Sequence, residues 1–323
     1  MHAPLLSPLQ KSLLDGWQRG FPLTSHPFAA IAETLGASED AVIEASADMI
    51  ARGMVSRLGL VVRPNTAGAS TLAALACAPH EIDAMAARIS AEPGVNHNYE
   101  REHPELPIWF VATGATREHV DATLSRIAER TGREVLDLPL LREYRIDLGF
   151  PLEGPCRPHD HTPAKRPADE QEKRVLAALA DGFAATPRPF ADAAVRLGLG
   201  EDEVLATLAG ALEAGIVKRI GWIVRHRPLG FSANAMCVFD VADTEIDAVA
   251  ARFLEAEAVT LLYRRRPAGR RWPYSLYAMI HGRDREVVER EVAALVARWP
   301  MRLDHRILFS TRCFKQTGAR LAA

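Results

Sequence analysis

The chain carries one pattern twice, and this duplication limits its fold more than any other feature. Residues of the first copy recur without a gap 162 positions later, from Gly20 and Gly182 to Gly68 and Gly230. Beyond this span the offset grows to 164 and then to 168, and the added residues fall in an arginine-rich turn of the second copy. The sequence therefore predicts a fused duplication, in which one architecture is built twice and the two copies have diverged.

The first sixty or so positions of each copy predict a winged helix-turn-helix. A first helix is expected around residues 8–19, and Pro27 opens a second helix because proline is favoured at the first helical position. Ser38 is a suitable N-cap for a third helix, which Gly53 ends. Residues 54–63 are then expected to form a two-stranded wing.

The rest of each copy predicts the order strand, helix, strand, strand, helix, strand. The first of these helices in the second copy has apolar residues at i, i+3, i+4, i+7 and i+8, namely Ile246, Val249, Ala250, Phe253 and Leu254. This order of elements is that of a ferredoxin-like βαββαβ unit. Two such units can pair sheet against sheet, so we expect an α+β fold whose two halves form a pseudo-twofold dimer.

These patterns divide the chain into five segments. They are a winged helix-turn-helix (1–68), a ferredoxin-like domain (69–150), a linker (151–168), a second winged helix-turn-helix (169–230) and a second ferredoxin-like domain (231–323). The linker holds five prolines and is expected to be stiff and extended.

Composition argues against several classes of protein. The 323 residues have a formal net charge of −2, whereas a dedicated nucleic-acid-binding protein usually carries a clear basic excess. The four cysteines lie far apart, so no zinc or iron–sulfur site is indicated, and we expect reduced thiols in a cytoplasmic protein. No apolar run approaches the roughly 18 residues that cross a membrane, and no secretion signal is recognised. We therefore expect no membrane association.

The expected recognition helices also argue against DNA binding. They begin with Glu39 and Asp40 in the first copy and with Glu201, Asp202 and Glu203 in the second. A helix that reads the major groove presents donors such as arginine or asparagine, with phosphate contacts around it. We predict structural roles for both helix-turn-helix units and no nucleic-acid partner.

The chemistry is concentrated in two predicted hairpins, of which the first carries His97, Tyr99, Arg101 and His103, followed by Trp109. Histidine exchanges protons near neutral pH because its unperturbed pKa lies near 6.5. In an uninterrupted strand the even spacing would put both histidines on one face, unless the following turn displaces the second. Two surface histidines on a polar hairpin are the alternative.

The second hairpin is rich in cations and aromatic rings. It holds Tyr263, Arg264, Arg265, Arg266, Arg270, Arg271 and Trp272. Arginine binds carboxylates bidentately, but side chains alternate along a strand, so two of the three consecutive arginines at most face a ligand. Arg270 and Arg271 are expected in a solvated turn. Together the hairpins indicate a flat, aromatic, anionic ligand and proton transfer.

The order of domains resembles the Lrp/AsnC regulators, but the hairpin strings are similar to an enzymatic branch of that family, the siroheme decarboxylases. The strings are 95–103 with 108–111 in the first copy, and 259–266, 272–276 and 279–285 in the second, together with 224–231 and 233–236. The resemblance covers nearly the whole chain. One departure is Leu106-Pro107, where an aromatic–asparagine pair is expected.

The resemblance implies a fused form of a two-subunit enzyme of heme d1 biosynthesis. Siroheme would lose carbon dioxide from two ring acetates, giving 12,18-didecarboxysiroheme. The iron belongs to the substrate, and no further cofactor is implied. Siroheme is the expected partner, while other proteins of the heme d1 pathway and further association of fused chains are left open.

The resemblance also implies roles for the hairpin residues. His97 and His103, with Tyr99, are the catalytic candidates: each histidine serves one acetate, or one donates the proton and the other ligates iron. The candidates for substrate binding are Arg101, Trp109, His226, Tyr263, Arg264, Arg265, Arg266, Trp272 and His281. The two tryptophans could instead be core residues, and His281 could be structural.

One productive pocket is expected rather than two, because the first copy has Thr113 in place of His281 and Pro64 in place of His226. Two other functions remain open from the sequence. An Lrp-like regulator would bind a small effector between the ferredoxin-like units, and a heme sensor or carrier would bind the ring without chemistry. A product assay separates the carrier from the decarboxylase.

Overall fold

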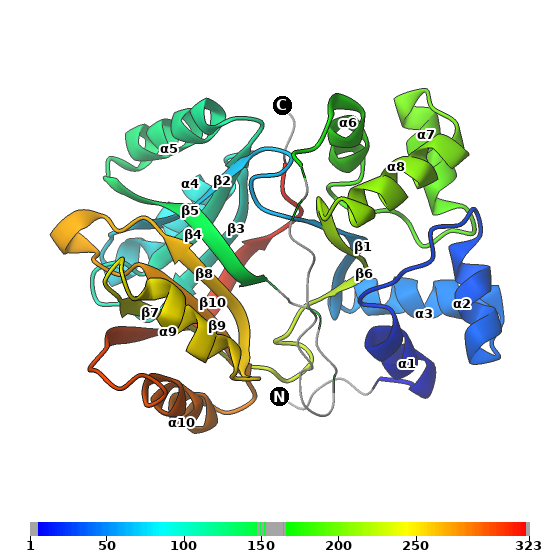
Figure 1. Ribbon diagram of the computed structural model, residues 1–323. Helices are drawn as coiled ribbons and strands as arrows, with labels where there is room; N and C mark the ends of the chain where they lie inside the picture. The colour runs from blue at the N-terminus through cyan, green and yellow to red at the C-terminus, as the bar shows by residue number, and fades with distance from the viewer. Residues whose placement is uncertain (1–5, 147–148, 150–151, 153–163, 165, 321–323) are drawn as a thin grey trace.

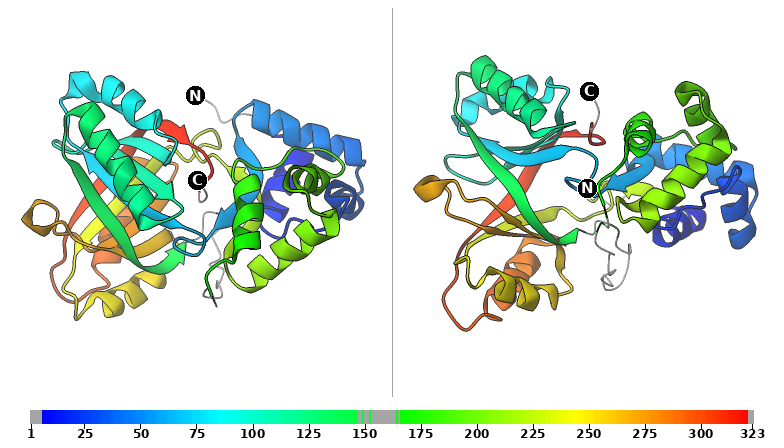
Figure 2. Two further views of the ribbon diagram at one scale, coloured as in Figure 1. Left: turned by 90° about the horizontal axis from the view of Figure 1, so that it is seen from above. Right: turned by 45° about the horizontal axis from the view of Figure 1, so that its top comes forward.

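The computed structural model describes residues 6–146, 149, 152, 164 and 166–320, which form two lobes (Figure 1). One lobe contains the helix-turn-helix units of both copies, and the other contains both ferredoxin-like units (Figure 2). Most of the predicted linker, 151–168, lies outside the described residues. No described helix combines the length and the apolar character that crossing a bilayer would require.

The helical lobe is built from six helices around one shared apolar core. They are α1 (Pro8–Gly16), α2 (Pro27–Leu35), α3 (Glu39–Ala51), α6 (Glu170–Ala178), α7 (Pro189–Leu197) and α8 (Glu201–Glu213). The rings of Phe21 and Phe183, which are repeat partners, lie 5.2 Å apart between centroids. The two helix-turn-helix units are therefore packed against each other.

Local sequence signals explain where these helices begin and end. The Ser38 hydroxyl accepts a hydrogen bond from the backbone N–H of Ala41 and so caps α3, as predicted. Gly36 ends α2 in the left-handed region, with φ of 63°, where a side chain would be strained. The first helix ends at Gly16 and is shorter than the predicted 8–19.

The wing differs from the prediction. Residues 54–63 form no hairpin of their own; they contain one strand, β1 (Val55–Val62), which pairs antiparallel with β6 (Val217–Val224) of the other copy. Gly59 lies opposite Gly221 in this ribbon. The predicted two-stranded wing within one copy was wrong because an uninterrupted extended segment has no turn, so its partner strand comes from the second copy.

The eight strands of the ferredoxin-like units close into one barrel in the order β10-β3-β4-β2-β5-β8-β9-β7. In chain order they are β2 (Ala69–Leu75), β3 (Val95–Arg101), β4 (Ile108–Gly114), β5 (Val135–Ile146), β7 (Ala233–Asp240), β8 (Val259–Arg265), β9 (Leu276–Gly282) and β10 (Asp304–Gln316). Each unit has the predicted strand and helix order, which confirms the duplicated α+β fold.

The last strand of each unit joins the two sheets. Residues Val135–Pro139 of β5 pair with β2 in their own unit, and Leu140–Ile146 continue alongside β8 of the other unit. In the same way β10 pairs first with β7 and then with β3. This exchange relates the two copies by a pseudo-twofold axis and brings residues from both ends of the chain to the same place.

The helices of the two ferredoxin-like units cover the outside of the barrel (Figures 1 and 2). They are α4 (Ile82–Ser90), α5 (Arg117–Thr131), α9 (Ile246–Leu254) and α10 (Arg285–Val296). Their apolar faces pack on the two sheets as separate cores, while Trp109, Trp272 and Tyr277 belong to a third core between the sheets. The space between the two sheets of the barrel is therefore filled by side chains around these three residues.

Candidate active site

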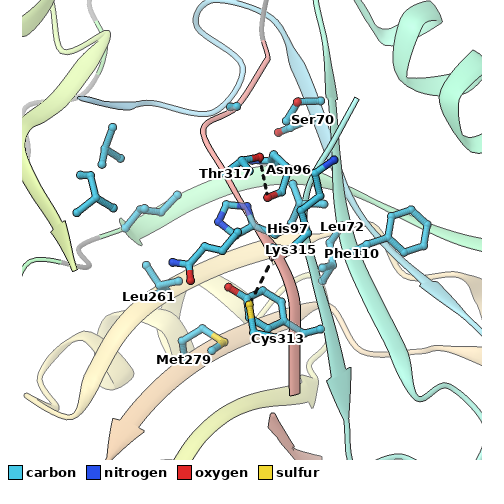
Figure 3. Close-up of a pocket in the computed structure, with 18 of the residues that line it drawn as sticks. Ser70, Leu72, Asn96, His97, Phe110, Leu261, Met279, Cys313, Lys315 and Thr317 are labelled. Carbon is cyan, nitrogen blue, oxygen red and sulfur yellow. Dashed lines mark hydrogen bonds between the residues drawn. The ribbon is translucent and has the colours of Figure 1, made fainter. Parts of the chain in front are cut away.

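A cavity of about 900 Å³ lies between the barrel and the β1–β6 ribbon, lined by residues of both. All eight strands of the barrel contribute residues to the barrel side, and the segment after β6 extends the ribbon side. This volume lies near the upper end of the range for small-molecule sites. Figure 3 shows side chains of both copies around it, including His97 from the first and Leu261 and Met279 from the second.

Eight of the predicted site residues line this cavity. They are His97, Tyr99, Arg101, Trp109, His226, Tyr263, Arg265 and His281. The first four belong to the first copy and the last four to the second, so the pseudo-twofold arrangement brings the two predicted sets together.

The structure places His103 outside the cavity lining. Strand β3 ends at Arg101, so the turn displaces His103 from the face that His97 occupies. The Nδ1 atom of His103 accepts hydrogen bonds from the backbone N–H groups of Glu105 and Leu106, at 3.2 and 3.0 Å. Of the two histidines considered as iron ligands, His97 is thus the one that lines the cavity.

Three second-copy residues also lie outside the lining. Arg264 points to the surface and pairs with Asp243 at 2.7 Å. Arg266 is exposed in the turn after β8. Trp272 is a core residue with 1% of its surface exposed, and its Nε1 donates to the Tyr277 hydroxyl at 2.7 Å. Side chains alternate along a strand, so Arg264 and Arg266 point away from the cavity while Arg265 between them faces inward.

His97 lies on β3 opposite Gln316 of β10 and is half-buried, with its ring at the cavity. Burial, and after it the positive charge of Arg57, lower the pKa of His97 to about 4. The imidazole is therefore neutral at neutral pH in the empty cavity. The unperturbed pKa near 6.5 expected for this histidine from the sequence was wrong for the folded chain.

Tyr99 lies two residues further along β3, opposite Cys313 of β10. Its ring lies 6.1 Å from that of His97, in a nearly parallel orientation. Burial raises the pKa of the Tyr99 phenol, and the adjacent Cys313 acts in the same direction. The hydroxyl is therefore protonated at neutral pH and can donate a hydrogen bond.

Arg101 and Arg265 occupy equivalent positions in the two copies and are both almost fully buried. Arg101 donates to the Leu308 carbonyl at 3.3 Å, and Arg265 donates to the Leu138 carbonyl at 2.8 Å. The Arg265 guanidinium also lies 4.7 Å from the ring centroid of Tyr263. Neither arginine forms an ion pair with a carboxylate of the described chain, so their charges remain available to an anion in the cavity.

His226 and His281 form a second histidine pair, with ring centroids 4.8 Å apart. The Nδ1 of His281 and the Thr260 hydroxyl share a hydrogen bond of 2.8 Å. Burial lowers the pKa of His281 well below its usual value, and the neighbouring His226 and Arg101 reinforce this. His226 lines the cavity together with Arg225 and Arg227 of the segment that follows β6.

Several polar residues that line the cavity were not predicted from the sequence, among them Arg57, Arg225, Arg227, Cys313 and Lys315. The repeat held a signal for two of them, because Arg57 recurs at Arg219 and Arg63 recurs at Arg225. Cys313 and Lys315 lie on β10, whose crossing to the other sheet cannot be seen in local periodicity. Within the described residues, no group of three histidine, cysteine or acidic side chains is placed to hold a metal ion.

The chain matches two family models, each of them twice. The AsnC-like ligand binding domain matches residues 67–145 and 228–315. The siroheme decarboxylase NirDL-like HTH domain matches residues 10–55 and 172–217. The siroheme decarboxylase NirDL subunit of Paracoccus pantotrophus is 44% identical over 320 residues, with 97% of each chain covered. The chain belongs to the siroheme decarboxylase NirDL family.

Separate subunits of this family match about half of the chain. The siroheme decarboxylase NirD subunit of Stutzerimonas stutzeri is 48% identical over 155 residues, which are 48% of this chain and 99% of the subunit. The NirL subunit of the same organism is 38% identical over 153 residues, covering 47% of this chain and 90% of the subunit. The expected fusion of two subunit types is thereby confirmed.

Solved structures of the family have the same fold. A crystal structure of the siroheme decarboxylase NirDL superposes with a TM-score of 0.68 at 26% identity, covering 97% of this chain and 94% of that one. A second, described as a co-complex with an iron-uroporphyrin III analogue, gives a TM-score of 0.65 at 25% identity, with 97% and 93% covered.

Proposed function

We propose that the chain decarboxylates siroheme, removing carbon dioxide from two ring acetates to give 12,18-didecarboxysiroheme. One observation carries the proposal: a single cavity gathers a histidine, a tyrosine and several arginines from both copies. Membership of the siroheme decarboxylase family supports it, as does the iron-uroporphyrin III analogue held by a related structure. No cofactor is required beyond the iron tetrapyrrole itself.

Binding of the ring follows from charge and shape. Siroheme is a flat polycarboxylate, and the cavity presents guanidinium groups at Arg57, Arg101, Arg225 and Arg265. Hydrogen bonds to charged partners contribute roughly 1.5–3 kcal/mol each. The arginines hold the carboxylates that do not react, because a strong ion pair on a reacting acetate would stabilise it in the ground state and raise the barrier.

The reaction breaks the carbon–carbon bond between the acetate methylene and its carboxylate. Carbon dioxide leaves, the electron pair stays on the methylene carbon, and a proton from the protein converts that carbon into a methyl group. His97 is the proposed donor for this proton. A positioned general acid typically accelerates such a step by about 10²–10⁴-fold.

His97 has to acquire its proton together with the substrate. Its imidazole is neutral in the empty cavity because burial and Arg57 hold its pKa at about 4. The carboxylates of bound siroheme add negative charge beside the ring, which raises the pKa of His97 and favours the imidazolium form. The protonated Tyr99 hydroxyl lies on the same strand and serves as a hydrogen-bond donor to the reacting group.

An apolar wall favours loss of the charged group. Leu261 and Met279 border the cavity (Figure 3), and Trp109 also lines it. A carboxylate placed against such side chains loses hydration, whereas neutral carbon dioxide does not need it. The cavity therefore combines a cationic region for the retained carboxylates with an apolar region for the reacting ones.

Anaerobic incubation with siroheme, followed by mass analysis of the extracted pigment, tests the proposal. We expect products lighter by one and then two carbon dioxide units. Siroheme that is bound and recovered unchanged would mark a carrier or sensor and would refute the enzymatic proposal.

A further inference from the structure

The pseudo-twofold axis puts Glu143 and Cys313 at the same position of the two copies. On β5, Glu143 lies opposite Tyr263, and on β10, Cys313 lies opposite Tyr99. Tyr263 and Tyr99 are themselves repeat partners. The first copy thus has a carboxylate where the second copy has a thiol, and of the two residues Cys313 lines the cavity.

Glu143 neutralises the cations at its own end. It accepts a hydrogen bond from Arg63, which lines the cavity, at 2.8 Å, and it also pairs with Lys218. The side chains of Lys218, Arg63 and Glu143 are 1%, 12% and 13% exposed, so this cluster is sheltered from water and weakly screened. The charge of Arg63 is therefore satisfied by the protein itself.

The other end has no such neutralisation. Arg225, the repeat partner of Arg63, lines the cavity and pairs with no carboxylate of the described chain. Burial raises the pKa of the Cys313 thiol, so the group that replaces Glu143 is uncharged at neutral pH. The two copies also differ at the position of His97, because its repeat partner in the second copy is Leu261.

We infer that Glu143 is an internal carboxylate that excludes substrate carboxylates from the Arg63 end, so that a polycarboxylate ring binds one way round, with a carboxylate on Arg225. The inference rests on the proposed function, because it assumes a polycarboxylate tetrapyrrole. It makes Glu143 a determinant of ring orientation and hence of which acetates meet His97.

The decisive experiment compares Cys313→Glu with Cys313→Gln in the full chain, with iron-uroporphyrin III as the probe and its absorption spectrum as the readout. A glutamate at position 313 is expected to pair with Arg225 as Glu143 pairs with Arg63. The glutamate variant should therefore bind roughly ten- to a hundredfold more weakly than the glutamine variant, which has nearly the same size. Equal affinities of the two variants would overturn the inference.

A second variant reads the orientation directly. Glu143→Gln leaves Arg63 available to the substrate, and we expect the ratio of the two singly decarboxylated siroheme isomers to change in the folded variant. An unchanged ratio would contradict the inference, and the Cys313 pair remains decisive if this variant does not fold. The proposed function is tested separately, because it is refuted if the wild-type protein does not decarboxylate siroheme. If the wild type turns over siroheme normally but Cys313→Glu and Cys313→Gln bind the probe with equal affinity, only the role of Glu143 in ring orientation is refuted.

Discussion

His97 lies directly opposite Gln316 across the junction of β3 and β10, so the last strand of the second copy borders the proposed proton donor of the first. The equivalent pair at the other junction is Leu261 and Ile146, both apolar. The proposed proton donor thus occupies one of two geometrically related positions. The expectation of one productive pocket is a prediction that a count of occupied tetrapyrrole sites per chain would test.

Replacing His97 by glutamine should lower the rate of decarboxylation by about 10²–10⁴-fold, because the proposed general acid is removed while the arginines remain. His103→Gln is the matched control. It should turn over siroheme at close to the wild-type rate, since His103 caps a turn outside the cavity lining. Product formation by the two variants is compared by mass analysis. Loss of turnover in His103→Gln but not in His97→Gln would contradict the assignment of His97 as the proton donor.

Siroheme binding should be accompanied by proton uptake at neutral pH. The pKa of His97 is about 4 in the empty cavity, and carboxylates placed beside it raise that value. Titration calorimetry in two buffers of different ionisation enthalpy measures the number of protons taken up. We expect a smaller uptake for His97→Gln than for the wild type; identical uptake would exclude His97 as the group that is protonated.

His97 should also make the empty protein sensitive to acid. Its folded pKa of about 4 lies below the unfolded value near 6.5, so the unfolded state binds more protons between these values. Its contribution to the free energy of unfolding is complete above pH 6.5 and is lost as the pH falls toward 4. Between pH 7 and pH 5, wild type should lose about 1–2 kcal/mol more than His97→Gln in denaturant unfolding. Equal losses would contradict the lowered pKa.

Trp272 should matter for stability, through the core between the sheets. Its ring lies 5.0 Å from that of Trp109, and its surface is 1% exposed. Trp272→Ala should lower the free energy of unfolding by about 3–5 kcal/mol. The exposed Arg266 provides the control, and Arg266→Ala should change stability by less than about 0.5 kcal/mol. Denaturant unfolding of both variants measures this, and a stable Trp272→Ala would argue against the core assignment.

The helix-turn-helix lobe should not bind DNA sequence-specifically. The first turn of α3 carries Glu39 and Asp40, and that of α8 carries three acidic residues. Glu201 is additionally paired with Arg188, which removes a cation from phosphate contact. A gel-shift assay with random duplex pools at physiological salt should select no sequence. Selection of a defined site would show that the acidic helices do not prevent recognition.

Much of the fold could be predicted because its signals are local. The Ser38 cap and the spacing of Ile246, Val249 and Phe253 depend on residues close in sequence, and the repeat is visible by comparing the sequence with itself. Strand partners across copies are not local. Nothing in residues 54–63 indicates that β1 pairs with β6. Local periodicity likewise does not indicate that β5 and β10 leave their own sheets to close a barrel.

The site was predicted in part for the same reason. His97, Tyr99 and Arg101 could be named because they lie on one strand that also carries family-like residues. His103 could not be placed, because its position depends on where β3 ends. The lowered pKa of His97 depends on burial and on Arg57, which comes from the other lobe. Such an effect appears only when the two lobes are assembled.

The central claim is that residues of both copies surround one tetrapyrrole, and a crystal structure of the full chain with siroheme tests it most directly. We predict the ring in the cavity between the barrel and the β1–β6 ribbon, with an acetate within about 3 Å of a His97 ring nitrogen. A retained carboxylate should lie on Arg225. A ring bound outside this cavity, or one whose acetates all lie away from His97, would contradict the account.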